Sequence, residues 1–284
     1  MKFSFSKSAT LIMASLTCLA NGQTLTFVGD INLARRSVED WASIFTPVRF
    51  ALRGDLVIGN LESPLTDQSH GRQGIDLRAS PSAVAALFPY THLSVENNHA
   101  QDGGDAGQLQ SRRILLQHDI TPVSTEPTYW KVNGRILALL SYLDGPLGAP
   151  IKTVQAAKEQ ADEVIVLPHW GAEYDAVTPR QREQARALAA AGASLIVGSG
   201  PHVLQGSEHI GKTLVLYSLG NFLFDQPYPA TWLGGAAHVT WREGTWKACL
   251  QPTFSRGGKL RSASRDEARQ AAKKTGLLRC TVWK

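Results

Sequence analysis

The chain has 284 residues, of which 43% are hydrophobic and 19% are charged, and its formal net charge is +5. This composition excludes a disordered or fibrous protein, and the length allows one large domain or two ordinary ones. The charge is uneven: residues 251–284 hold nine Lys and Arg against two acidic residues, which leaves the mature remainder mildly acidic.

The first residues have the pattern of an export signal. Lys2 and Lys7 precede a moderately apolar segment at 9–20, and Ala20-Asn21-Gly22 fits a small-x-small cleavage site. The apolar segment is too short to serve as a stable membrane anchor. We therefore expect residues 1–22 to be a signal peptide and the mature protein to be periplasmic or extracellular. The segment ending at Cys18 fits a lipoprotein cleavage site poorly, so lipidation is the less favoured alternative.

Removal of the signal would leave two cysteines, Cys249 and Cys280. In an oxidising compartment they can pair and tie the C-terminal tail to the domain, or they can remain two free thiols. The sequence has no metal-binding cluster of cysteines.

Short apolar runs between turn residues predict strands, and amphipathic periods with capping residues predict helices. In chain order we expect a strand at 24–28, a helix at 37–50 interrupted by Pro47, a strand at 55–59, a helix at 80–87, a strand at 92–95, a helix at 106–118 and a strand at 120–123. There follow a hairpin at 129–141 turning at Asn133-Gly134, a helix at 152–161, a strand at 164–167, a helix at 179–191, strands at 194–197 and 214–219, and a hairpin at 237–250 turning at Glu243-Gly244.

These elements indicate one α/β domain over residues 23–250, followed by a basic tail at 251–284. In the tail, Ser264-Arg265-Asp266-Glu267 has the pattern of a capping box that begins a short helix. Such a basic helix can bind a polyanion or an anionic membrane surface, but it is more often only a solvated face.

Polar side chains recur where the predicted strands end. A single polar strand end is an ordinary turn or a buried structural residue, but five or six in one chain favour a functional site. The residues concerned are Asp30, Asn32, Glu62, Asn97, Asn98, His99, Asp102, His169, Trp170, Glu173, His202, Gln205, Asn221 and Asp225.

This mixture of carboxylates, amides and imidazoles suits Mn²⁺, Fe or Zn²⁺. One or two such ions would generate hydroxide from water and stabilise charge on a phosphoryl or acyl group. His99, with Asp102 nearby to orient it, is a candidate to protonate a leaving group.

Six motifs occur in order over about residues 24–250: FVGDI at 27–31, GNLESP at 59–64, NNH at 97–99 with Asp102 and Gly104, HWG at 169–171 with Glu173 and Tyr174, PHVLQG at 201–206, and YSLGNF at 217–222 with Asp225 and Gln226. Together they resemble the bacterial capsule-synthesis, poly-γ-glutamate (CapA-type, PGA_cap) family. The resemblance implies a metallophosphoesterase-like sandwich of two mixed β-sheets flanked by helices.

By position, the resemblance also implies site roles. Asp30, Glu62, Asn98, His169 and His202 would bind metal, with His99 and Asp102 catalytic. The expected substrate contacts are Asn32, Asn97, Trp170, Glu173, Gln205, Asn221 and Asp225. Asn32 stands where the broader phosphoesterase pattern has a His ligand, and Gly200 stands where the family usually has another His, so two-metal catalysis is less well supported than metal binding.

The function implied is that of an exported protein for capsule or poly-γ-glutamate synthesis, export or anchoring, with metal-dependent hydrolysis of a phosphoester or amide. Its expected partners are an anionic cell-surface polymer or its precursor and membrane proteins of capsule synthesis or export, and not nucleic acid. The alternatives are a non-catalytic polyanion-binding scaffold on the same fold and a general exported phosphoesterase.

Overall fold

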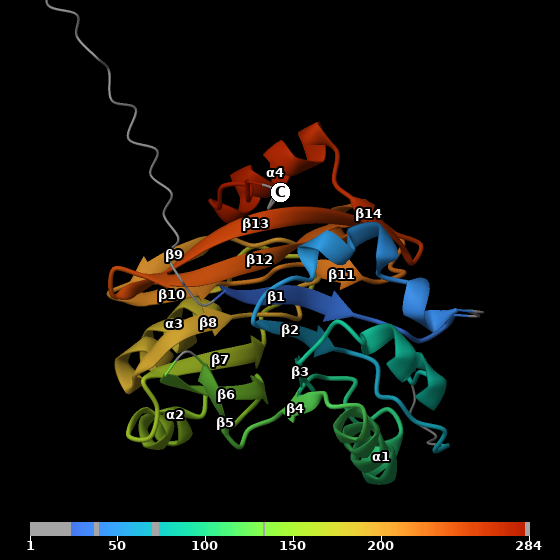
Figure 1. Cartoon of the computed structure of the whole chain (residues 1–284), viewed down its shortest axis with the longest axis horizontal. Coiled ribbons are helices and arrows are strands. Elements are labelled where there is room, and N and C mark those ends of the chain that lie inside the picture. Colours follow the sequence, from blue (N-terminus) through green and yellow to red (C-terminus); the bar gives the residue numbers. More distant parts are fainter. Residues whose placement is uncertain (1–23, 37–39, 70–73, 133, 282–284) are drawn as a thin grey trace, which may run out of the picture.

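The computed structural model describes residues 24–36, 40–69, 74–132 and 134–281, so the expected signal peptide lies outside the described residues. Within these ranges the protein is a mixed α/β sandwich of two mixed sheets flanked by helices, as predicted (Figure 1).

The first sheet has eight strands, in the order β14 (Lys259–Ser262), β13 (Thr245–Arg256), β12 (Leu233–Arg242), β1 (Thr24–Ile31), β2 (Leu56–Leu61), β3 (His92–Ser94) and β4 (Thr121–Val123), with β11 (Asn221–Leu223) also pairing with β1. Strands β1 to β4 run parallel, whereas β12 to β14 form an antiparallel meander.

The second sheet has six strands, in the order β5 (Thr128–Val132), β6 (Arg135–Leu143), β7 (Glu163–His169), β8 (Ala193–Val197), β10 (Thr213–Leu216) and β9 (Ser207–Ile210). Its four central strands are parallel, and both edge strands are antiparallel. The helices are α1 (Gly104–Gln117), α2 (Ile151–Lys158), α3 (Pro179–Ala191) and α4 (Arg265–Thr275), with 3₁₀ segments η1 (Trp41–Ser43), η2 (Thr46–Ala51), η3 (Pro81–Leu87) and η4 (Pro229–Thr231).

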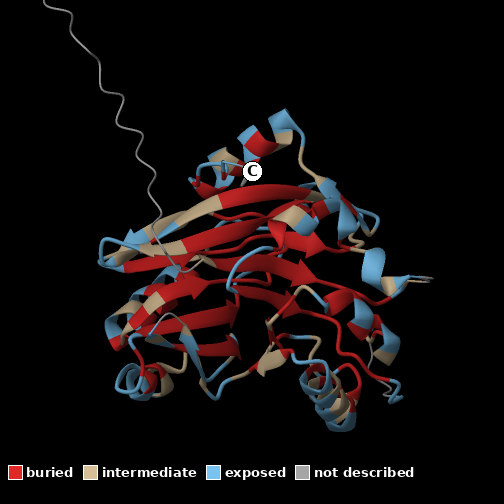
Figure 2. Ribbon diagram, viewed as in Figure 1, coloured by how far each residue is buried: buried red, intermediate tan, exposed pale blue. Residues whose placement is uncertain are grey.

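Alternation along β1 shows how the core is layered. Leu25 and Phe27 point into the apolar layer between the two sheets, where they meet Leu139 and Ile165 of the second sheet. Val28 lies in the core on the opposite face of the first sheet, beneath the 3₁₀ segments. The central strands, among them β1, β2 and β7, are therefore buried on both faces (Figure 2), which fixes the register in which their ends meet.

The hairpins and the capped helices are confirmed. The β12–β13 pairing joins Arg242 to Thr245 across the predicted turn, and α3 has the predicted bounds with Thr178 as its N-cap. The capping box at Ser264 also begins α4 as predicted.

The expected helix at 37–50 is wrong over its described part. That part forms two short 3₁₀ segments, η1 and η2, because Pro47 lies in the first turn of the second segment and Val48 has non-helical backbone angles. Residues 37–39 lie outside the described residues. The strand expected at 164–167 continues through Pro168 to His169.

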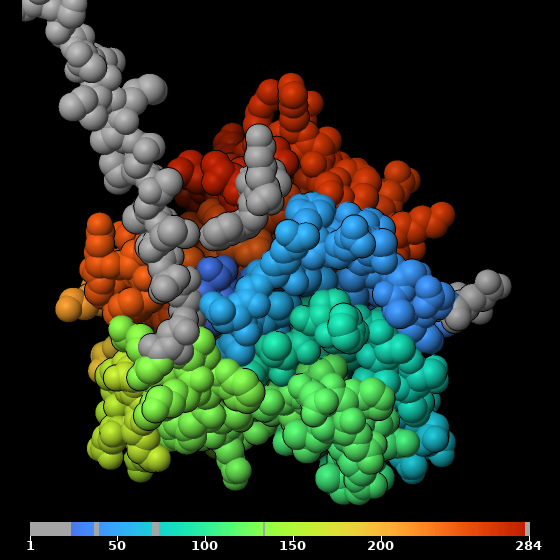
Figure 3. Space-filling model, in the orientation of Figure 1, coloured from blue at the N-terminus to red at the C-terminus, as the bar shows by residue number. Residues whose placement is uncertain are grey.

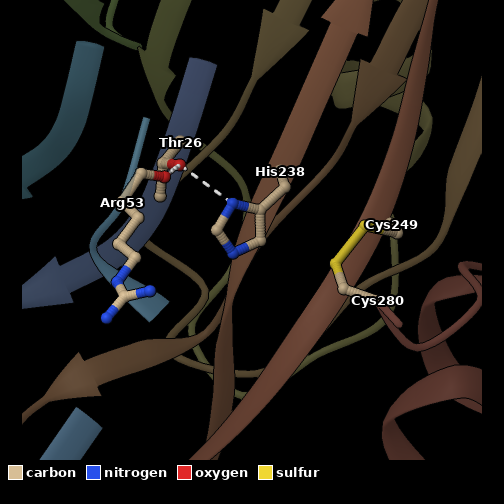
Figure 4. The surroundings of a disulfide bond; sticks show 5 residues. All are labelled: Thr26, Arg53, His238, Cys249 and Cys280. Carbon is tan, nitrogen blue, oxygen red and sulfur yellow. Dashed lines mark hydrogen bonds between the residues drawn. A yellow bond between two sulfur atoms is a disulfide. The ribbon is translucent and has the colours of Figure 1, made fainter. Parts of the chain in front are cut away.

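The C-terminal residues pack on the first sheet. The boundary expected between residues 250 and 251 falls inside β13, β14 extends the same sheet, and α4 contacts β12 and β13. Cys249 and Cys280 form a disulfide (Figure 4), and the backbone of Leu250 hydrogen-bonds Leu278 and Cys280. Early and late parts of the chain consequently lie against each other on one face (Figure 3).

Candidate metal centre and its pocket

Parallel pairing brings distant strand ends to one point. Asp30, near the end of β1, is the register partner of Asn60 on β2 and of Asn221 on β11. On the second sheet, His169 ends β7 and forms an isolated bridge to Ser199 after β8. The carboxyl ends of strands from both sheets thus meet, as the sequence pattern predicts.

Three buried side chains form the centre of this site. Asp30 and Glu62 are fully buried and His202 is 3% exposed. One ligand atom from each lies within 4.8 Å of the others, so the group can hold a metal ion. His202 Nδ1 is 3.2 Å from Asp30 Oδ2, and His202 Nε2 is 3.5 Å from Glu62 Oε1.

The donor chemistry of this group fits a divalent cation. Among the described residues, Glu62 Oε1 is a buried carboxylate oxygen with no hydrogen-bond partner. A buried carboxylate oxygen without a hydrogen bond is costly because it has lost its water, and the ion pair with His202 at 3.5 Å is too long to replace that hydrogen bond. Two carboxylates and one imidazole form an oxygen and nitrogen donor set that suits Mn²⁺, Fe or Zn²⁺.

The pKa shifts reflect the same crowding of charge. Burial raises the pKa of Glu62 to about 8, although the imidazole of His202 opposes the shift. Burial disfavours protonation of His202, but Glu62 and Asp30 outweigh it and raise the pKa of His202 to about 10. Burial also acts to raise the pKa of Asp30, yet His202, His169 and Asn60 together lower it. A proton on His202 therefore supplies positive charge between the two carboxylates while the site is empty, and a metal ion bound by His202 would displace that proton.

Asn60 connects the predicted ligands, and the sequence analysis did not assign it to the site. Its Nδ2 donates to Asp30 Oδ1 at 2.9 Å and lies 3.4 Å from Glu62 Oε2 and 3.3 Å from His169 Nδ1. Its Oδ1 accepts from Asn97 Nδ2 at 3.1 Å. The signal available in the sequence was its place in the GNLE motif, two residues before Glu62.

His169 lies beside the three-residue group. Its Nδ1 is 3.1 Å from Ser199 Oγ, and burial lowers the pKa of His169 to about 4 despite the nearby charge of Asp30. The imidazole is consequently neutral at ordinary pH, the form in which histidine binds metals.

His99 and Asp102 form the predicted pair. His99 Nδ1 lies 2.8 Å from Asp102 Oδ2, and this carboxylate oxygen also accepts from the backbone N–H of Leu77 at 2.8 Å. Asp102 is 2% exposed. A buried carboxylate fixed by the Leu77 amide orients the His99 ring, as the sequence analysis expected.

A pocket of about 340 Å³ opens beside this site. Its wall combines charged, aromatic and apolar side chains: Arg35, Ile75, Leu77, His99, Glu173, Tyr174, His202, Phe224, Asp225, Gln226, Pro227 and Tyr228. His99 and His202 face the same space, so a group bound there would meet both the candidate acid and the candidate metal centre.

Four of the expected substrate contacts lie at or next to this pocket. Glu173 and Asp225 line it. Asn221 is buried, and its Oδ1 lies 3.0 Å from His202 Nδ1, so it orients that ring. Asn32 is also buried and donates to Asp225 Oδ1 at 3.0 Å.

Asn97 and Asn98 differ in burial. Asn97 is 4% exposed and donates to Asn60 Oδ1 and to the carbonyl of Leu61. Asn98 is exposed, and its role as a metal ligand remains a prediction.

Trp170 and Gln205 lie in the packed interior. Trp170 is 2% exposed, stacks on Tyr217 and donates from Nε1 to the Tyr217 carbonyl at 2.9 Å. Gln205 accepts from Gln181 Nε2 and donates to the Asp175 carbonyl. Both side chains stabilise the loops after β7 and β8, and their contact with a substrate remains a prediction.

Gly200 adopts a conformation that favours glycine, with φ of +105°. An added Cβ would lie 3.0 Å from the Trp170 carbonyl oxygen and 3.2 Å from His169 Nε2. Its N–H instead points at Asp30 Oδ2, at 3.4 Å. The position where the family pattern has a second His is therefore occupied here by backbone.

The fold resembles that of a solved phosphatase structure. The structure of a phosphatase from Mycoplasma pneumoniae superposes with a TM-score of 0.58, covering 89% of this chain and 98% of that chain at 14% identity.

Within the described residues, each helix is too short or too polar to cross a bilayer.

The sequence comparisons define the family. The model for "Bacterial capsule synthesis protein PGA_cap" matches residues 24–151 and 146–226, and this chain belongs to that family. It is 35% identical over 243 residues to the "PGA biosynthesis protein CapA" of Bacillus subtilis (strain 168), covering 72% of this chain. It is 32% identical over 253 residues to the "Capsule biosynthesis protein CapA" of Bacillus anthracis, covering 73% of this chain. The matches span 64% and 61% of those two relatives.

Proposed function

We propose that this protein hydrolyses a phosphoester or amide bond in an anionic cell-surface polymer or its precursor, using a divalent metal ion held by Asp30, Glu62 and His202. The observation that carries the proposal is the buried Glu62 Oε1, which has no hydrogen-bond partner among the described residues and faces His202 beside an open pocket. A cation at this point would satisfy that oxygen.

A bound ion would supply an activated water and a positive charge that stabilises the developing oxyanion. The chain's own residues would orient the ligands and transfer the proton. Asn60 and Asn221 fix the orientation of Asp30 and His202 through hydrogen bonds. His99, oriented by Asp102, faces the pocket and is placed to give a proton to the leaving group.

The relatives supply the biological setting of the proposal. Their names connect CapA proteins with capsule and PGA biosynthesis, and we place this chain in synthesis, export or anchoring of such a polymer, together with membrane proteins of that process. We also place it in the periplasm or outside the cell. The Cys249–Cys280 disulfide supports this location, because disulfides persist in oxidising compartments.

Hydrolysis is tested on a panel of aryl phosphates and γ-glutamyl amides, with Mn²⁺, Fe²⁺ or Zn²⁺ added to the purified protein. His99→Ala should lower kcat by roughly 10²- to 10⁴-fold while metal content stays unchanged. His118→Ala is the matched control, because His118 is an exposed histidine at the end of α1. Turnover that survives in His99→Ala, or that is equally lost in His118→Ala, would contradict the assigned role.

A non-catalytic polymer-binding scaffold is the second candidate. Two observations favour it: the carboxamide of Asn32 is bonded to Asp225 and to the Ala34 backbone, and Gly200 offers no side chain. Metal binding without turnover on any member of the panel would select this candidate.

A further inference from the structure

The turn between β13 and β14 is attached to the wall of the pocket. The backbone N–H of Gly258, in this turn, donates to the carbonyl of Phe224 at 3.2 Å. Trp232 Nε1 donates to the carbonyl of Gln226 at 3.0 Å. Phe224 and Gln226 both line the pocket, so the turn and Trp232 lie directly behind its rim, at the sheet edge formed by β14 (Figure 1).

The turn carries two exposed cations. Arg256 and Lys259 are register partners at the ends of β13 and β14, and both are exposed. The Arg256 guanidinium lies over the Trp232 ring, 4.5 Å from its centroid. Within the described part of the chain, neither cation has a carboxylate within salt-bridge distance, since every ion pair found there involves other residues.

Two further arginines join the turn to the pocket. Arg35 lines the pocket and forms a two-point ion pair with Asp225, at 2.6 and 3.0 Å. Arg36 Nη1 donates to the Gly258 carbonyl at 2.8 Å, while its Nη2 has no hydrogen-bond partner in the described residues. Four cations and the two carboxylates that line the pocket, Asp225 and Glu173, give the strip and the pocket wall together a formal charge of +2.

We propose that this strip, defined as Arg35, Arg36, Arg256 and Lys259, binds an extended stretch of a linear polyanion whose anionic unit occupies the pocket. The inference rests on the proposed function and deepens it, because it names how the substrate's length is recognised. A monomeric ligand can contact the pocket but not the two cations on the turn. A chain with an anionic group on each repeat reaches both the pocket and the two cations on the turn.

The aromatic residues on the strip support an extended acidic chain over a nucleic acid. Arg256 covers one face of Trp232, whose ring also packs edge-on against Phe254 at 6.0 Å. The indole therefore holds the guanidinium in place and is not free to stack on a base. Guanidinium and ammonium groups recognise repeated carboxylates as well as repeated phosphates, so the ligand is a linear polyanion without bases, either a polycarboxylate or a polyphosphate.

The test compares two double variants that remove the same charge. Arg256→Gln/Lys259→Gln alters the strip. Lys212→Gln/Lys247→Gln alters two exposed lysines away from the strip. Lys247 lies on β13, and Lys212 lies in the turn between β9 and β10 of the second sheet, where its carbonyl accepts from Thr245 Oγ1. Lys247 and Arg256 lie nine residues apart on β13, about 30 Å at the rise of a strand. The net charge of the two proteins is identical, so any difference reports position.

Binding is measured by fluorescence anisotropy on labelled polyglutamate and labelled polyphosphate, at low and at physiological ionic strength. The strip variant should bind the favoured polymer roughly 3- to 10-fold more weakly at low salt, with a smaller loss at higher salt, and the control pair should bind as wild type does. The arm that shows the loss identifies the carboxylate or the phosphate polymer. Equal losses in both variants, no loss in either, or a loss only on anionic vesicles would overturn the proposal.

Metal content and turnover of a monomeric substrate separate this inference from the proposed function. Both should be unchanged in Arg256→Gln/Lys259→Gln, because neither residue lines the pocket. If wild type does not turn over the monomer while the strip variant still loses polymer affinity, the proposed hydrolysis is refuted and polymer binding by the strip is supported. If wild type turns over the monomer and the strip variant binds the polymer as wild type does, only polymer binding by the strip is refuted.

Discussion

Replacement of Glu62 by Gln tests the metal centre through stability, independently of any substrate. Glu62 is fully buried, and its Oε1 has no hydrogen-bond partner among the described residues. Gln keeps the volume and removes the charge, while Asp30 remains to balance a proton on His202, so the metal-free variant should still fold cooperatively and its own Tm serves as the reference. The same change removes an anionic ligand, so the variant should lose the stabilisation that metal gives to the wild type.

The size of the effect follows from linkage. A metal present at 100 times its Kd stabilises the folded state by about 2.7 kcal/mol. A domain of about 250 residues unfolds with an entropy of roughly 0.5 kcal/mol/K near its Tm. We therefore expect metal to raise the Tm of wild type by about 5 °C and the Tm of Glu62→Gln by less than about 1 °C.

The assay is differential scanning calorimetry on chelator-treated protein, with Mn²⁺, Fe²⁺ or Zn²⁺ added back one at a time. Glu126→Gln is the matched control, because Glu126 is an exposed glutamate outside the site and should leave the metal response intact. An unshifted wild-type Tm with every ion, or an equal shift in Glu62→Gln, would refute the assignment of a metal centre to this group.

Three further predictions concern the surroundings of the site and the fold. Asn60→Ala should weaken metal affinity by roughly 10- to 100-fold in a calorimetric titration, because Asn60 orients Asp30 from outside the ligand group. Burial lowers the pKa of His92 to about 4, below about 6.5 in the unfolded chain, so stability should fall by up to about 3 kcal/mol between pH 6.5 and 4 in urea titrations, and His92→Phe should flatten that slope. Replacing Cys249 and Cys280 with Ser opens a link between residues 31 apart in sequence and should cost about 3 to 4 kcal/mol on the chain-entropy model, read as a Tm lowered by about 7 °C, whereas an unchanged Tm would show that the C-terminal residues are held by packing alone.

The sequence predicted most of the regular elements because their signals are local. Thr178, Pro179 and Gly192 delimit α3 through capping and a left-handed end, and Glu243-Gly244 turns a hairpin. The strands β9, β11 and β14 were missed. Each is three or four residues long, too short to show an alternating pattern of its own. Strand β11 also pairs with β1, which is distant in sequence, whereas β9 and β14 pair with neighbouring strands across short turns.

The sequence indicated which side chains lie together where they stand at strand ends, while their roles remain predictions. Asp30, Glu62 and His202 meet because parallel pairing places the ends of β1 and β2 together, and the sequence shows both ends. Asn60 was missed because its importance lies in reaching three neighbours at once, which only the folded register reveals. The strip on the β13–β14 turn was likewise hidden, since Arg36 and Gly258 meet only across a separation of 222 residues.

The two departures from the family pattern act in the same direction. Asn32 uses its carboxamide on Asp225 and on the backbone of Ala34, so it closes the loop after β1 and does not face the three-residue group. Gly200 places its backbone N–H against the Asp30 oxygen that also faces His202, so this oxygen already has two neighbours of positive polarity. Because the amide hydrogen carries partial positive charge, it substitutes there for a cation. The ligand atoms of Asp30, Glu62 and His202 converge on one space, which favours one bound ion over two. Metal analysis of the loaded protein should accordingly find about one equivalent per chain.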